Sequence, residues 1–266
     1  MSQTARKPVI EVENLVTHYG HTKILNDVNL SVYEEEIMVI MGGSGSGKST
    51  LLRYLLGLGY PTSGSIRLLG RDITRLSAME MFELRKNMGV AFQGGALLSS
   101  MTVGENVQLP LVEHTRLDRK TMEIMARMKL EVVNLGGFEH LMPSQLSGGM
   151  IKRAAVARAI IMDPQLMFFD EPSAGLDPVV SAELDELILR LRDAMHMTII
   201  VVTHELQSAY KIADRITVLD QGSILMTGTV DEVRASGNER IQSLLNRTPR
   251  SVEMSAEEYL DRLWGF

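Results

Sequence analysis

A glycine-rich stretch early in the chain, GGSGSGKST at Gly42–Thr50, restricts the possible folds more than any other segment. It fits the pattern G-x-x-x-x-G-K-[ST], with Lys48 and Ser49 at the last two places. Glycines let the backbone curl so that successive N–H groups point at one anion, because side chains would obstruct that conformation. Lysine places a cation against the outer phosphates, and the serine hydroxyl can ligate Mg²⁺. The candidate phosphate-binding residues are Gly42, Gly43, Ser44, Gly45, Ser46, Gly47, Lys48, Ser49 and Thr50.

The segments that flank this loop predict a strand before it and a helix after it. Glu36–Met41 (EIMVIM) is typical of a buried strand, and Leu51–Leu56 (LLRYLL) is typical of a helix. A phosphate in the loop would therefore lie at a helix N-terminus, where unpaired N–H groups and the helix dipole favour negative charge. An ordinary glycine-rich turn would not need this order of elements, so a nucleotide is the expected ligand.

Two acids follow an apolar run later in the chain. Leu166–Phe169 (LMFF) predicts a buried strand, and Asp170 and Glu171 come directly after it. An acid delivered by a strand beside a phosphate loop holds Mg²⁺ in nucleotide-hydrolysing enzymes, and an adjacent acid can polarise the attacking water. Structural acids are common at strand ends, but two in succession favour a metal ligand at Asp170 and a catalytic base at Glu171.

Polar residues also end two further predicted strands. Gln93 follows Gly89–Phe92, and His204 comes shortly after Thr198–Val202. Ligands of parallel sheets bind at the carboxyl ends of the strands, so Gln93 is a candidate contact to ligand or metal. His204 is a candidate to hydrogen-bond the outermost phosphate. Taken alone, each would be an ordinary residue, a solvated glutamine or a histidine without a role.

The N-terminal segment predicts a separate β region. Val9–Thr17 alternates between apolar and polar residues, and Val28–Val32 predicts a second short strand. Tyr19 lies between these two strands, and both come before the phosphate-loop strand in the sequence. Its ring could stack on adenine, or it could be a core or turn tyrosine.

Residues 102–161 carry helical patterns without the alternation of strands. They open with a capping-box signal at Thr102–Glu105, as an earlier helix does at Ser77–Glu80. Leu146–Met150 (LSGGM) begins another helix, and its small residues make a second anion site. The chain already has one phosphate loop, so the presence of a second anion site needs a separate explanation.

Composition excludes several classes of protein. The net charge is −6, from 27 basic and 33 acidic residues, so nothing indicates a nucleic-acid partner. The chain has no cysteine, which excludes disulfides and thiolate metal sites. No run reaches the ~18 apolar residues of a membrane helix. We expect a soluble, cytoplasmic protein, and any membrane-spanning part would have to come from other chains.

With these motifs in one order, the chain resembles the ATPase subunits of ABC transporters over about residues 8–245. The motifs that carry the resemblance are the phosphate loop Gly42–Thr50, the Q-loop glutamine Gln93, the signature Leu146–Met150, the Walker B strand Leu166–Asp170 with the catalytic Glu171, the D-loop Ser173–Asp177, the switch histidine His204 and the adenine-stacking Tyr19. The resemblance implies ATP and Mg²⁺ as cofactors, with Ser49, Gln93 and Asp170 around the metal.

The resemblance also implies an architecture. The expected fold is α/β, a P-loop NTPase (RecA-like) core over residues 8–93 and 163–245 with an N-terminal antiparallel β region. A helical signature subdomain is expected over residues 94–162. In this family two subunits pair head to tail, and the signature of one closes over the ATP held by the other. Ser147, Gly148 and Gly149 would then contact the partner's ATP, which accounts for the second anion site.

Several segments narrow the resemblance to one branch of the family. Most members have glutamine after LSGG, whereas this chain has Met150. Together with Gln93–Val107 and Pro110–Leu117, this residue makes the chain similar to the Mla-type ATPases of MCE-linked phospholipid transporters. The implied assembly is an ATPase homodimer at the inner membrane, with an integral-membrane permease, a small STAS-domain protein and a periplasmic MCE lipid-binding protein.

Alternative functions remain open at this point. An ABC importer for amino acids or another small solute shares every catalytic motif. A DNA-repair ATPase would need a long coiled coil between Lys48 and Leu146, and a translation factor would need two cassettes per chain. A regulatory cassette without hydrolysis would lack residues such as Glu171 and His204, which are present.

The last part of the chain, residues 246–266, predicts a tail outside the ATPase domain of residues 1–245. Ser255–Phe266 opens with a capping-box signal and carries apolar residues four apart, including Trp264. We expect a short helix that packs on its own domain, on the second subunit or on the STAS partner.

Overall fold

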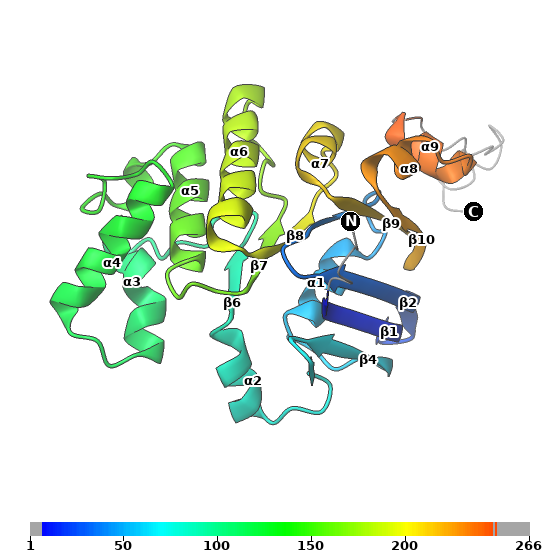
Figure 1. The fold of residues 1–266 in the computed structure, drawn as a ribbon, viewed down its shortest axis with the longest axis horizontal. Coiled ribbons are helices and arrows are strands. Elements are labelled where there is room, and N and C mark those ends of the chain that lie inside the picture. Colours follow the sequence, from blue (N-terminus) through cyan, green and yellow to red (C-terminus); the bar gives the residue numbers. More distant parts are fainter. Residues whose placement is uncertain (1–6, 247, 249–266) are drawn as a thin grey trace, which may run out of the picture.

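The computed structural model describes residues 7–246 and residue 248. The predicted tail helix over Ser255–Phe266 lies outside these residues. The described chain contains two β-sheets and a set of helices, and helices α3 to α5 form one end of the molecule (Figure 1). The helices are α1 (Lys48–Leu55), α2 (Ala78–Arg85), α3 (Val103–His114), α4 (Arg119–Val132), α5 (Gly148–Ala159), α6 (Pro178–Met195), α7 (Leu206–Ile212), α8 (Val230–Arg234) and α9 (Glu239–Leu245), with a 3₁₀ turn at Pro143–Gln145.

The larger sheet has six strands in the order β10-β9-β3-β8-β7-β6. Its members are β3 (Ile37–Met41), β6 (Met88–Ala91), β7 (Leu166–Asp170), β8 (Thr198–Val202), β9 (Arg215–Asp220) and β10 (Ser223–Gly228). Strands β9, β3, β8, β7 and β6 run parallel, and only β10 is antiparallel to its neighbour. Their carboxyl ends therefore lie at one edge of the sheet.

The smaller sheet is antiparallel and confirms the predicted N-terminal β region. Its order is β2-β1-β4-β5. The strands are β1 (Pro8–Tyr19), β2 (Thr22–Tyr33), β4 (Ser63–Leu68) and β5 (Arg71–Asp72). The second strand is longer than the predicted Val28–Val32, because polar residues such as Thr22 and Lys23, both exposed, continue to pair with β1.

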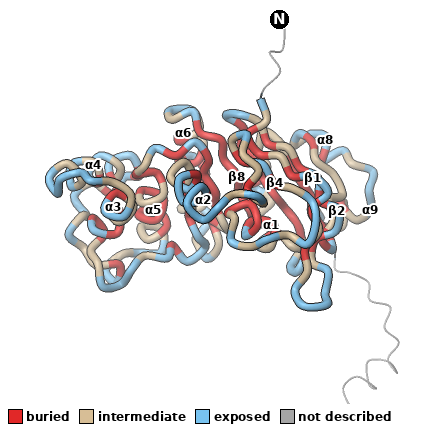
Figure 2. Tube along the Cα trace, turned by 90° about the horizontal axis from the view of Figure 1, so that it is seen from below, coloured by how far each residue is buried: buried red, intermediate tan, exposed pale blue. Residues whose placement is uncertain are grey.

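Burial concentrates in the strands and the inward sides of the helices, while the rim loops are exposed (Figure 2). Residues of β3 alternate between the two faces of the six-stranded sheet, so each face has its own core. Ile37 and Val39 pack with residues of α5, α6 and α7 on one face. Met38 and Ile40 pack with α1 and the antiparallel sheet on the other face. The sheet is thus covered on both sides, as parallel sheets are.

Local sequence signals set where several helices begin. Two of the predicted capping boxes form, at Ser77 with Glu80 and at Thr102 with Glu105, and the third, at Ser255, lies outside the described residues. Helix α6 begins at Pro178, where the fixed φ of proline suits the first turn, and the Asp177 carboxylate accepts from the backbone N–H groups of Val179 and Val180.

Candidate nucleotide-binding site

Four sequence motifs meet at the carboxyl edge of the parallel strands. The phosphate loop follows β3, His204 follows β8, Asp170 and Glu171 end β7, and Gln93 follows β6. Because β3, β8, β7 and β6 are consecutive neighbours in the sheet, these motifs stand side by side along that edge. Segments that are far apart in sequence therefore form one site, as the strand-end argument predicts.

The phosphate loop ends in a helix N-terminus. Gly47 is the N-cap of α1, with a φ of 105° that non-glycine residues rarely adopt. The buried Lys48 ammonium donates to the carbonyl oxygens of Gly42 at 2.9 Å and Gly43 at 3.0 Å. Burial lowers the pKa of Lys48, while the nearby carboxylates of Glu171 and Asp170 act in the opposite direction. The structure thus places a cation on the backbone of the loop, at the N-terminus of α1.

The β9–β10 hairpin holds the phosphate loop from behind. The backbone N–H of Gly222 donates to the carbonyl oxygen of Ser46 at 2.9 Å. A Cβ at Gly42 would lie 2.2 Å from the carbonyl oxygen of Leu219, so only glycine fits against this strand. The first glycine of the motif is therefore required by packing as well as by loop conformation.

A cavity of about 270 Å³ opens in front of the loop. Its lining consists of Tyr19, Ile24 and residues 45–50 of the loop. Tyr19 is the last residue of β1 and is 49% exposed, so its ring stands free at the mouth of this cavity. This is a place from which an aromatic ring can stack on a nucleotide base. Within the described residues, no signature residue contributes to this lining.

The two acids at the carboxyl end of β7 are Asp170, its last residue, and Glu171, which follows it. Burial raises the pKa of Asp170 and the neighbouring Glu171 raises it further, whereas Lys152 and Lys48 lower it. Glu171 has a φ of 47°, an uncommon conformation for a residue with a side chain, and its N–H donates to Val202 at 2.8 Å. The backbone is thus turned at the residue that is predicted to act as base.

The Glu171 carboxylate and the His204 ring are in contact. Oε2 of Glu171 lies 2.9 Å from Nδ1 of His204 and accepts from the His204 backbone N–H at 3.3 Å. The hydroxyl of Thr203 donates to the same oxygen at 3.3 Å. The structure therefore brings two of the predicted catalytic residues together, with Thr203 as an unpredicted partner.

The signature segment lies at the start of α5 and is exposed. Ser147 is the N-cap of α5, and its hydroxyl accepts from the backbone N–H of Met150 at 3.3 Å. Gly149 packs close to α6, since a Cβ there would lie 2.7 Å from Val180. Ser147 and Gly148 face solvent, which leaves this helix end accessible to a second molecule.

Two cations on α5 were not predicted as part of the site. Lys152 is buried, and its ammonium donates to the carbonyl oxygens of Gln93 and Glu171. Arg158 donates to the carbonyl oxygens of Gly95 and Ala96. A lysine among apolar residues of the IKRAAVARA segment was a possible signal, but its partners could not be known before the strands were placed.

The predicted metal ligands consist of oxygen donors, which suit Mg²⁺. They are the hydroxyl of Ser49, the side-chain amide of Gln93 and the carboxylate of Asp170. Among the described residues, no group of three or more His, Cys, Asp or Glu side chains forms another metal site. The raised pKa of Asp170, with Glu171 beside it, fits a position that a divalent cation would stabilise.

A phosphate loop at a helix N-terminus, paired acids and a histidine on one sheet edge, and a signature helix define a P-loop ATPase of the ATP-binding cassette type. The chain belongs to the ABC transporter family, whose sequence pattern matches residues 25–174. It is 40% identical over 259 residues to the intermembrane phospholipid transport system ATP-binding protein MlaF of Haemophilus influenzae, covering 96% of this chain and 98% of that protein. The resemblance to Mla-type ATPases is therefore supported.

Other relatives and solved structures agree with this class. The probable ribonucleotide transport ATP-binding protein mkl of Mycobacterium leprae is 39% identical, over 94% of this chain and 72% of that protein. The ATP-binding cassette MJ0796, in a dimer bound to ADP and Pi, matches with a TM-score of 0.77 and 30% identity over 83% of this chain and 98% of that chain. The chain is thus an ATP-hydrolysing subunit of an ABC transporter. ATP-binding cassettes of this class dimerise and work with membrane permeases.

Proposed function

We propose that this ATPase powers phospholipid transport between the inner and outer membranes of a Gram-negative envelope, from the cytoplasmic face of the inner membrane. The observation that carries the proposal is the 40% identity to MlaF over nearly the whole of both chains. The proposed assembly is a homodimer with a permease, a STAS-domain protein and a periplasmic MCE lipid-binding protein. No described helix has the length and apolar character to cross a bilayer, so the permease would supply the membrane path.

The proposed chemistry assigns a role to each motif. Lys48 and the loop N–H groups bind the phosphates, and Tyr19 stacks on the adenine. Ser49, Gln93 and Asp170 would hold Mg²⁺, which supplies charge neutralisation on the phosphates when bound. Glu171 orients and deprotonates the attacking water, and His204 positions Glu171 and contacts the outermost phosphate.

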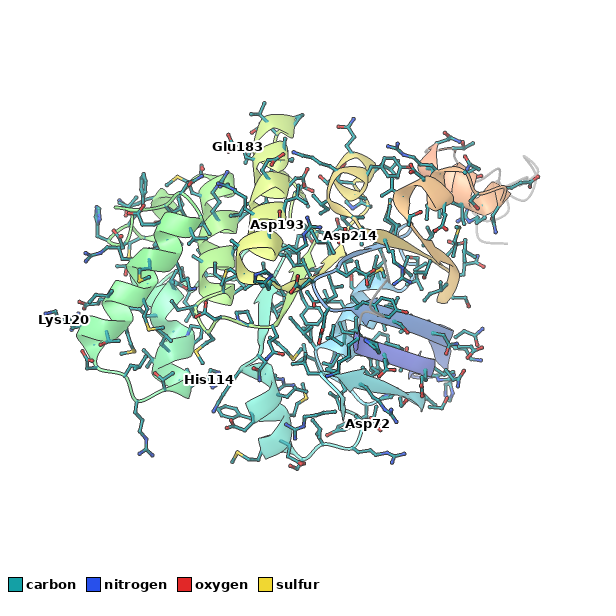
Figure 3. The ribbon with its side chains drawn as sticks, in the orientation of Figure 1. Asp72, His114, Lys120, Glu183, Asp193 and Asp214 are labelled. Carbon is teal, nitrogen blue, oxygen red and sulfur yellow. The ribbon has the colours of Figure 1, made fainter. Side chains whose placement is uncertain are left out.

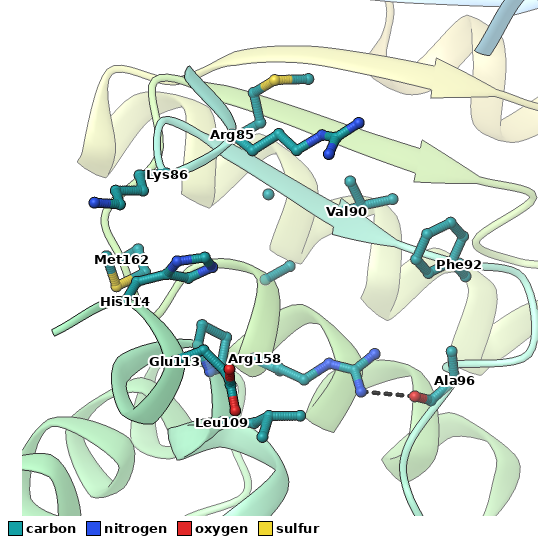
Figure 4. Close-up of a pocket in the computed structure, with 14 residues that line it drawn as sticks. Arg85, Lys86, Val90, Phe92, Ala96, Leu109, Glu113, His114, Arg158 and Met162 are labelled. Atoms are coloured by element: carbon teal, nitrogen blue, oxygen red, sulfur yellow. Dashed lines mark hydrogen bonds between the residues drawn. The ribbon is translucent and has the colours of Figure 1, made fainter. Parts of the chain in front are cut away.

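A groove with lining residues different from those of the phosphate-loop cavity is the proposed permease site. It has a volume of about 450 Å³ and lies between α2, β6, α3 and α5 (Figure 4). Phe92 and Leu109 give it an apolar wall. Its charged lining residues are Arg85, Lys86, Arg158 and one acid, Glu113, so positive charge is in excess, although Lys86 also pairs with Glu83 at 2.8 Å. Ala96, in the loop after Gln93, also lines it, so an occupant would touch the loop that is proposed to reach the nucleotide. A short permease helix with an acidic end would match this groove.

The substrate test uses the ATPase assembled with its permease in proteoliposomes. We expect phospholipids to co-purify with the complex and ATP to drive their transfer to an acceptor MCE protein. The alternative is an importer for amino acids or another small solute, and the mkl relatives suggest nucleotides as a further class. ATP-driven uptake of amino acids or ribonucleotides without lipid transfer would overturn the phospholipid proposal.

The same complex tests the groove. Leu109→Glu should weaken co-purification of the permease, because an acid would enter the apolar wall. Ile124→Glu is the matched control, since Ile124 is an exposed apolar residue on α4 outside the groove. Equal recovery of the permease with both variants would exclude this docking site.

The hydrolysis test is Glu171→Gln. Loss of the general base should reduce kcat by roughly 10²–10⁴-fold while ATP still binds. The variant should therefore accumulate as an ATP-bound dimer, which size-exclusion chromatography in excess ATP would detect. Normal turnover by this variant would remove Glu171 from the proposed mechanism.

A further inference from the structure

Lys152 is a buried cation on the signature helix to which the proposed chemistry gives no role. Only 9% of the residue is exposed, although an ammonium loses much of its hydration on burial. Such a residue is retained at a cost unless its donors find partners. Its neighbour Arg153 is equally buried, but its guanidinium has other partners, the carbonyl oxygen of Val133 and the carboxylate of Glu183. Glu183 lies on α6, at the top of the view in Figure 3.

The partners of Lys152 are the backbone ends of two adjacent strands. Its Nζ donates to the carbonyl oxygen of Gln93, just after β6, and lies 3.4 Å from the carbonyl oxygen of Glu171, just after β7. Strands β6 and β7 pair directly in the sheet. One ammonium therefore joins α5 to the main chain of both residues that are proposed to act on the metal and the attacking water.

The loop after Gln93 is fastened to α5 at further points. Arg158, farther along the same helix, donates to the carbonyl oxygen of Gly95 at 2.8 Å and to that of Ala96 at 2.6 Å. Gly95 has a φ of 75°, and a Cβ there would lie 2.7 Å from Ile151 on α5. The loop backbone thus packs directly on the helix, and Lys152 forms the attachment nearest to the catalytic residues.

The charge of Lys152 also faces the two acids. Lys48 and Lys152 both interact electrostatically with Asp170 and Glu171. Lys48 belongs to the phosphate loop and would be attracted to the ATP phosphates. Lys152, on α5, would then stay close to the two acids. A neutral side chain of the same length would keep the packing and lose both the donors and the charge.

We propose that Lys152 is a positioning residue, which fixes the backbone of Gln93 and Glu171 to the signature helix of the same chain. Each movement of that helix over a partner's ATP would then be transmitted to the catalytic residues of its own subunit. This inference rests on the ATPase dimer proposed above, and it deepens that proposal by assigning a residue outside the recognised motifs.

The first test is made on the isolated full-length chain and needs no activity. In Lys152→Met, hydrogen exchange at the amides of Gly95 and Ala174 should become at least about tenfold faster, because these amides donate to Phe92 and Glu171 in the two fastened loops. Arg153→Met is the matched control, which removes a buried cation from the same helix. Unchanged exchange in Lys152→Met, or equal acceleration in the control, would overturn the inference even if the proposed transport function fails.

The second test separates positioning from general damage to the fold. Lys152→Met should lower kcat about 10- to 100-fold with the KM for ATP unchanged within about twofold, because misplaced catalytic groups cost rate and not ground-state binding. Lys152→Arg, which keeps a cation and several donors, should recover most of that rate. A parallel rise in KM, or no recovery with arginine, would contradict a positioning role.

A third comparison uses mixed dimers isolated with two affinity tags. In one, Lys152→Met is in the chain with an intact Glu171, and the other chain carries Glu171→Gln. In the second, both substitutions are in one chain, so the active catalytic residues belong to the other, unmodified chain. The inference requires the rate loss only in the first dimer. Loss in the second dimer alone would show that Lys152 acts through the signature surface, and equal loss in both dimers would show general damage to the fold; either result would overturn the inference.

Discussion

At the scale of single residues, the two adjacent glycines of the phosphate loop differ in what surrounds them. A Cβ at Gly42 would meet the backbone oxygen of Leu219, whereas a Cβ at Gly43 would lie an ordinary 3.6 Å from the Leu244 side chain. Gly42→Ala should therefore force the loop away from the hairpin, at a cost of about 1–3 kcal/mol, and ATP affinity should fall strongly. Gly43→Ala is the control and should bind nearly as the original chain does, as a fluorescent ATP analogue would measure. Similar losses in both variants would contradict the packing argument.

The residues that form the motifs could be predicted from the sequence, because each one lies at a fixed spacing within a pattern or directly after a predicted strand. The contact between Glu171 and His204 was not predicted as such, since it depends on β7 lying beside β8. Lys152 and Arg158 could not be assigned for the same reason. Their partners are backbone carbonyls, and a carbonyl leaves no residue-type signal in the sequence.

At the scale of elements, local signals predicted helix starts better than strand lengths. The capping boxes at Ser77 and Thr102 involve residues three apart, so the sequence contains all of their information. Strand β2 extends from Thr22, well before the predicted start at Val28, because pairing with β1 stabilises residues whose own β propensity is low.

The capping boxes also predict a pH dependence, and a third one forms at the start of α8, between Thr229 and Glu232. Backbone N–H donation from the N-cap lowers the pKa of Glu80, Glu105 and Glu232 below the ordinary value of 4.5. The unfolded chain then binds more protons around that pH, so these groups contribute stability above pH 4.5 and lose it as the pH falls through their folded-state pKa values. The free energy of unfolding, from urea titrations between pH 3 and 7, should depend less on pH in the triple Glu→Gln variant.

Glu34→Gln is the control for that experiment, because Glu34 is an exposed acid away from any helix N-cap. It should leave the pH profile unchanged. A triple variant whose profile matches that of the original chain would show that the boxes contribute no pH-dependent stability.

At the scale of the whole molecule, the order of strands in the sheet could not be predicted from the chain alone. Strand β3 lies between β8 and β9, which come much later in the sequence, and this placement brings the phosphate loop beside His204. The residues alone predicted the N-terminus of α5 as a second anion site, and only the family resemblance assigned it to a partner's ATP. If that assignment is correct, the site on one chain is incomplete.

Mixed dimers test this incompleteness. Lys48→Ala chains should bind ATP at least about tenfold more weakly, since hydrogen bonds to charged groups contribute roughly 1.5–3 kcal/mol. Ser147→Arg chains should keep a good phosphate loop and lose the signature. Mixing the two inactive variants should restore partial hydrolysis, because one composite site then receives both intact parts. No recovery at any ratio would count against the head-to-tail arrangement.

The hairpin that backs the phosphate loop has a consequence for the kinetics of binding. Gly222 donates to Ser46, and its own carbonyl accepts from Asn26 at 2.8 Å, so the β9–β10 turn connects the loop to strand β2. Little conformational entropy then remains to be lost on association. ATP capture should be a single fast phase limited by encounter, without a slower ordering step. Slow events in the cycle would belong to subunit closure and product release, and the affinity for nucleotide would be regulated through dissociation.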